Sequence, residues 1–108
     1  MPSILYTVRA TLPTLQLRGR YLAWLVPDHV VAVKAGGAEG VRVVLPDRAN
    51  EAAPAVVEVQ YVFPTRKAFD TYLREHAPAL RADSLKRFPP ESGISYERQI
   101  AEIATEMT

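Results

Sequence analysis

Cysteine is absent from the 108-residue chain, which excludes disulfides, thiolate nucleophiles and cysteine-based metal sites. An excess of charge is absent too, because 13 basic and 12 acidic side chains leave a net charge of +1. This balance argues against binding to nucleic acid by phosphate neutralisation and against a polybasic membrane anchor. No apolar run is long enough to span a bilayer, and residues 1–4 lack the pattern of a leader, so we expect a cytoplasmic protein.

Histidine is scarce as well, and the two that occur, His29 and His76, lie far apart in the sequence. They lack the i,i+4 spacing with which a helix presents a metal-binding pair. Neither a glycine-rich phosphate loop nor a serine nucleophile motif is present. The sequence therefore predicts no bound metal and no cofactor.

What the chain does contain is the composition of a globular protein, with 48% hydrophobic and 23% charged residues. A chain of this length buries roughly 65% of its extended surface on folding. We therefore expect residues 1–108 to form a single domain.

Hydrophobic alternation predicts four strands, over residues 4–11, 39–45, 55–63 and 94–100. Two helical segments lie between them, and Thr14 and Thr65 are suited to cap their starts. Pro27 either kinks the first segment or opens a second short helix, and Pro78 breaks the other segment. The order strand, helix, strand, strand, helix, strand predicts a ferredoxin-like α+β fold. In that fold a four-stranded antiparallel sheet carries both broken helices on one face.

The two faces of the predicted sheet differ in character. One is almost wholly apolar and should be covered by the helices; it carries Tyr6, Val8, Val57, Val59, Tyr61 and Phe63. The other mixes apolar and charged side chains, and we expect it to pack against the same face of a second copy. The residues expected at this homodimer interface are Leu5, Arg9, Arg42, Val44, Glu58 and Gln60. Exposure to solvent is the alternative, since half-polar faces are common in antiparallel sheets.

Segments along nearly the whole chain match a known pattern: Ile4-Leu5-Tyr6-Thr7-Val8, Trp24-Leu25, Asp28-His29-Val30, residues 59–63, residues 69–83 and Arg87-Phe88. In these segments the chain resembles an uncharacterised bacterial family of the dimeric α+β barrel superfamily. The resemblance implies a ferredoxin-like protomer that pairs through its sheet, without an established activity. The wider superfamily includes cofactor-free monooxygenases, haem-degrading enzymes and small stress proteins, whose ligands lie between helices and sheet. The haem degraders carry an asparagine on the first strand, where this chain offers Tyr6 and Thr7.

A pocket between helices and sheet is the site to expect in such a fold, and its predicted lining is Tyr6, Trp24, His29, Tyr61 and His76. His76 continues the apolar stripe that starts at Phe69 and should point at the sheet. An imidazole beside phenols can act as a general base there, or it can be a hydrogen-bonded boundary residue. His29 has a capping or surface role as its alternative, and Trp24 a place in the core.

Three functions are compatible with this reading. The leading hypothesis is a homodimeric protein that binds a small apolar or aromatic molecule in the pocket. The second is a cofactor-independent monooxygenase or isomerase with His76 as general base. The third is a structural or interaction module without a ligand.

Overall fold

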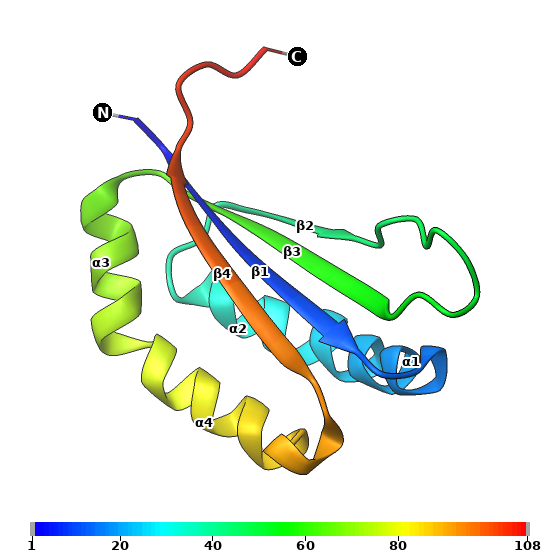
Figure 1. Ribbon diagram of the computed structural model, residues 1–108. Helices are drawn as coiled ribbons and strands as arrows, with labels where there is room; N and C mark the ends of the chain where they lie inside the picture. The colour runs from blue at the N-terminus through cyan, green and yellow to red at the C-terminus, as the bar shows by residue number, and fades with distance from the viewer. Residues whose placement is uncertain (1, 108) are drawn as a thin grey trace.

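A four-stranded antiparallel sheet forms the centre of the molecule (Figure 1). In the computed structural model, which describes residues 2–107, its strands are β1 (Ile4–Leu12), β2 (Gly40–Val44), β3 (Ala55–Phe63) and β4 (Ser95–Glu102). They lie in the order β2-β3-β1-β4, so the two long central strands come from distant parts of the chain. In the register Tyr6 of β1 lies opposite Tyr61 of β3 on one side and Ile100 of β4 on the other.

The helices cover one face of this sheet (Figure 1). Between β1 and β2 the chain forms α1 (Leu15–Trp24), a π-helical turn η1 (Leu25–His29) and α2 (Val30–Ala35). Between β3 and β4 it forms α3 (Arg66–Glu75), α4 (Ala77–Arg87) and a 3-10 turn η2 (Pro90–Ser92). The predicted ferredoxin-like arrangement is confirmed. Within residues 2–107 the helices are too short or too polar for any of them to traverse a lipid bilayer.

Both predicted helix caps are present. The side-chain oxygen of Thr14 accepts a hydrogen bond from the Leu17 N–H, and that of Thr65 accepts one from the Ala68 N–H, each at 3.0 Å. Each bond satisfies one of the backbone donors that a helix leaves free at its start. The caps therefore fix where α1 and α3 leave the sheet.

The two prolines interrupt their helices in different ways. Pro27 lies inside η1, where the Val30 N–H donates to the Leu25 carbonyl five residues back, so the helix widens and then continues as α2. Pro78 lies in the first turn of α4, where a missing N–H costs little. The break before it falls at His76, whose φ of −120° ends α3. At Pro27 the sequence left two alternatives open, a kink and a second short helix. The structure has a π-helical turn there, and the short helix α2 follows it.

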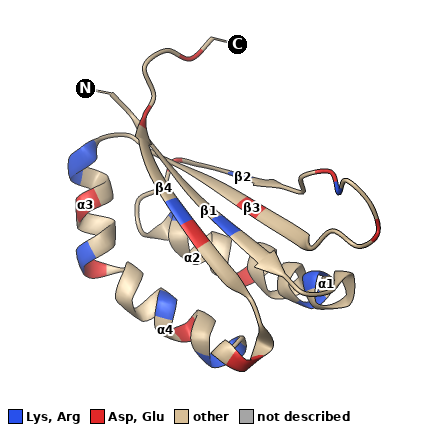
Figure 2. Cartoon of the chain, in the orientation of Figure 1, with Lys and Arg blue, Asp and Glu red and all other residues tan. Residues whose placement is uncertain are grey.

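The hydrophobic core lies between helices and sheet, and the predicted covered face supplies much of it. Its fully buried side chains include Ile4, Val57, Val59, Tyr61, Phe63 and, from α3, Phe69. The opposite face of the sheet carries no helix (Figure 2), and in the register Arg9 of β1 lies between Glu58 of β3 and Glu97 of β4. On that face Arg9 pairs with Glu58 at 3.2 Å, and Gln60 joins Glu58 to Arg42 through hydrogen bonds.

Candidate functional site

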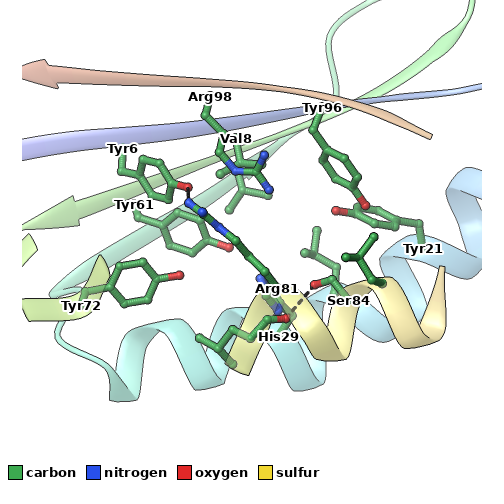
Figure 3. A pocket seen from close by; sticks show the side chains of 14 residues that line it. Tyr6, Val8, Tyr21, His29, Tyr61, Tyr72, Arg81, Ser84, Tyr96 and Arg98 are labelled. Carbon is green, nitrogen blue, oxygen red and sulfur yellow. Dashed lines mark hydrogen bonds between the residues drawn. The ribbon is translucent and has the colours of Figure 1, made fainter. Parts of the chain in front are cut away.

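A cavity of about 290 Å³ lies between the helical layer and the sheet (Figure 3). Its walls come from all three long strands, from α1 and η1, and from α3 and α4. The chain has five tyrosines, and all five line this cavity: Tyr6, Tyr21, Tyr61, Tyr72 and Tyr96. Between them lie apolar side chains such as Val8, Leu25 and Leu80. The cavity is thus an apolar space edged by phenols.

Local periodicity explains why the tyrosines converge. Tyr6 and Tyr61 face each other across β1 and β3, with ring centres 6.0 Å apart and planes at 28°. Tyr96 lies opposite Ala10 on the same face of the sheet. Tyr21 and Tyr72 occupy the buried faces of α1 and α3. Strand and helix periods therefore bring all five phenols to one layer.

Burial favours the neutral form of four of these phenols, those of Tyr21, Tyr61, Tyr72 and Tyr96. It raises the pKa of Tyr61 and of Tyr21 well above the usual value, and neighbouring phenols add to the effect. Burial also raises the pKa of Tyr72, to about 12, although the charges of Arg81 and Arg98 oppose it. At neutral pH the hydroxyls of these four tyrosines can donate and accept hydrogen bonds, but they do not serve as phenolate bases or nucleophiles.

His29 is the imidazole that faces the cavity. It ends the π-helical turn, is half-buried, and its ring centre lies 4.8 Å from that of Trp24. Its Nδ1 is buried, and no group within residues 2–107 forms a hydrogen bond with it. Burial lowers the pKa of His29 below its usual value, against the opposing charge of Asp83. The ring is therefore neutral at pH 7 and able to accept a proton.

The other two predicted pocket residues lie elsewhere. Trp24 is buried behind His29, where its ring packs on Phe88 with centres 5.5 Å apart. His76 is exposed at the break between α3 and α4, stacked on Tyr72 at 6.4 Å. The expectation that His76 points at the sheet is wrong, because α3 ends at Glu75 and His76 lies at the helix break with an exposed side chain. The structure thus brings together Tyr6, His29 and Tyr61, but not Trp24 or His76.

Two arginines at the cavity were not predicted from the sequence. Arg81 of α4 donates from Nη2 to the Tyr6 hydroxyl at 3.3 Å. Arg98 of β4 lies with its guanidinium carbon 5.4 Å from the centre of the Tyr96 ring. Strand alternation could have identified Arg98, because it lies two residues after Tyr96 and therefore shares the inward face of β4 with it. Among residues 2–107 no cluster of three or more potential metal ligands is found.

These features place the chain in the class of ferredoxin-like α+β proteins with a ligand-sized cavity between sheet and helices. It belongs to the family described as Domain of unknown function (DUF4286), whose model matches residues 3–103. The sequence resemblance to an uncharacterised family is thereby confirmed, while its bacterial origin stays a prediction. No curated protein matches the sequence.

Several solved structures share the fold at low sequence identity. A dimeric ferredoxin-like protein from an uncultured marine organism is 14% identical, with a TM-score of 0.69 and coverage of 99% of this chain and 100% of that one. A mutant of SnoaB, a cofactor-independent oxygenase from Streptomyces nogalater, is 10% identical, with a TM-score of 0.68 and coverage of 99% and 98%. An EthD-like protein from Ralstonia eutropha is 19% identical, with a TM-score of 0.64 and coverage of 96% of each chain. Such matches establish the shared fold, whereas function depends on the site.

Proposed function

We propose that this protein binds a small aromatic or apolar molecule with oxygen substituents in the tyrosine-lined cavity. The observation that carries the proposal is the convergence of all five tyrosines on one space of about 290 Å³. A phenol offers an apolar ring for stacking and a hydroxyl that needs a polar partner when buried. A ligand with aromatic rings and oxygen atoms can both stack on the tyrosine rings and form hydrogen bonds with their hydroxyls. Purely apolar core side chains could not form those hydrogen bonds.

Filling the cavity should weaken binding. Ser84 lines the cavity from α4, and its hydroxyl donates a hydrogen bond to the Leu80 carbonyl of its own helix. We expect Ser84→Phe to project a ring into the space and to weaken binding of 2-naphthol at least about tenfold in calorimetric titration. Ala82→Phe is the matched control, because Ala82 is exposed on the same helix outside the cavity lining. Equal affinities in wild type and Ser84→Phe would place the binding of 2-naphthol elsewhere and refute the proposal.

The proposed assembly is a homodimer in which the two open sheet faces pack together. Half-buried Leu5 and Val44 lie on this face beside the polar side chains of Arg9, Arg42, Glu58 and Gln60. A second copy would cover the apolar atoms and leave the charges paired within each sheet. The description of one fold neighbour as a dimeric ferredoxin-like protein supports this arrangement.

A second candidate function is cofactor-independent oxidation of a phenolic ligand by dioxygen. It is favoured by the fold shared with SnoaB and by a neutral imidazole in the cavity wall. Because His76 lies outside the cavity, we propose His29 as the general base that would take the phenol proton. A naphthoquinol that binds but is oxidised in air no faster than in protein-free buffer would leave the binding function alone.

A further inference from the structure

We propose that the ligand is an aromatic carboxylic acid whose carboxylate is held by Arg81 and Arg98 while its rings lie among the tyrosines. This inference rests on the proposed function, since it names the ligand class of the same cavity. Its basis is the placement of two positive charges, from two different elements, on a cavity that is otherwise neutral.

The two arginines reach the cavity from α4 and from β4 (Figure 3). Arg81, exposed at the edge of the cavity, donates a hydrogen bond to the Tyr6 hydroxyl. Arg98 lies opposite Val8 in the register and is stacked beside Tyr96 on the same strand. A guanidinium group pairs with both oxygens of a planar carboxylate, so two of them and a phenol offer a set of donors that one acid group can satisfy.

Neither guanidinium group has an acidic partner within residues 2–107. The ion pairs of that part of the chain join Arg9 to Glu58 and Arg74 to Glu75. No Asp or Glu of residues 2–107 lines the cavity either. Like charges that share a site repel one another, and an anionic ligand relieves that repulsion. A neutral ligand of the same shape gains nothing from the arginines' charge.

The size of the cavity limits the acid. Ligand pockets generally enclose ~300–1,000 Å³, so a cavity of about 290 Å³ is at the small end of that range. One aromatic ring, or two fused rings, is therefore the appropriate body for the ligand. The tilted and stacked rings of Tyr6, Tyr61 and Tyr72 offer faces against which such a body can pack.

The test compares two probes of the same shape, 2-naphthoate and 2-naphthamide, by calorimetric titration of the wild-type protein. At neutral pH the first carries a carboxylate and the second an uncharged amide. We expect 2-naphthoate to bind at least about tenfold more tightly, since two charge-assisted pairs act on it alone. We also expect its affinity, but not that of the amide, to fall as salt is added.

Substitution of the arginines should remove this preference. Arg81→Gln and Arg98→Gln are each expected to weaken 2-naphthoate about tenfold and to change 2-naphthamide less than about twofold. Arg87→Gln is the matched control, because Arg87 is an exposed arginine on α4 outside the cavity lining. Melting temperatures of all variants show whether each remains folded.

Two different failures can be told apart. If both probes bind wild type equally, or if the variants weaken both to the same extent, the acid-binding inference is wrong and the cavity still binds small molecules. If neither probe nor 2-naphthol binds, the proposed function fails and the inference fails with it.

Discussion

A tyrosine differs from a phenylalanine by one hydroxyl, and at the cavity this difference occurs at five positions. A closed core would use phenylalanine or leucine there, because a buried hydroxyl without a partner costs free energy. Tyr6 receives a hydrogen bond from Arg81, and the remaining hydroxyls lie near one another or near the cavity. At the scale of single residues, this placement of polar atoms supports the proposed binding of a ligand.

The burial of His29 should be visible in its titration. Because burial lowers the pKa of His29 below the usual ~6.5, the folded protein resists protonation of this ring while the unfolded chain does not. The free energy of unfolding should therefore be fully retained above about pH 6.5 and should fall as the pH drops below it. Proton NMR of the His76→Gln variant, which keeps one histidine, measures this pKa directly. A midpoint at or above the usual value would contradict the structure around His29.

Some site residues could be predicted from the sequence and others could not. Tyr6 and Tyr61 could be predicted, because strict alternation fixes which face of a strand a side chain occupies. His76 was misplaced, because the 3.6-residue period was carried through a helix break whose position only the backbone shows. Tyr21 and Tyr72 read as ordinary core positions on helical stripes, since a sequence pattern does not distinguish a packed core from a cavity wall.

At the scale of elements, the first helix of each helical segment, α1 and α3, begins at a threonine cap. The strands and both caps could be predicted, since alternation and capping are local signals. The π-helical turn could not, because a proline within a helical pattern is compatible with a kink, a break or a widened turn. It takes the packing of α2 against the sheet to select among these.

Removal of the Thr65 hydroxyl should destabilise the protein without altering its fold. Thr65→Ala loses the bond from the Ala68 N–H and leaves a donor of α3 unsatisfied. We expect a loss of ~1 kcal/mol in the free energy of unfolding, measured by urea denaturation. Thr65→Ser keeps the oxygen and should stay within a few tenths of a kcal/mol of wild type. A loss of equal size in both variants would assign the effect to the methyl group instead of the cap.

At the scale of the whole molecule, the sheet separates two different surfaces. One surface is covered by helices and holds the cavity. The other carries the half-buried Leu5 and Val44 beside charged side chains such as Arg9 and Glu58. Stable interfaces between proteins bury about 1,200–2,000 Å² in total, and the open sheet face is the surface that the proposed dimer would bury. The proposed dimer would use that surface and leave the cavity untouched.

A charge on the open face should separate the copies. Leu5 lies on the central strand β1, beside Val62 of β3, so Leu5→Glu would bury an unpaired carboxylate in the proposed interface. We expect the dimer to dissociate at least ~100-fold more readily and light scattering at micromolar concentration to report a 12.0 kDa species. Val31→Glu, at an exposed position of α2, should keep twice that mass. Wild-type protein that is already a monomer would remove the dimer from the proposal.

The π-helical turn Leu25–His29 positions the side chain of His29 at the cavity. In an α-helix each residue advances the side chain by about 100°, so the loss of a single residue from this turn would rotate everything that follows it by that angle. His29 would then leave the cavity wall, although no atom of the wall itself had been changed. The position of His29 at the cavity therefore depends on the number of residues in this turn. An insertion or deletion within the turn would alter the site more than a substitution there.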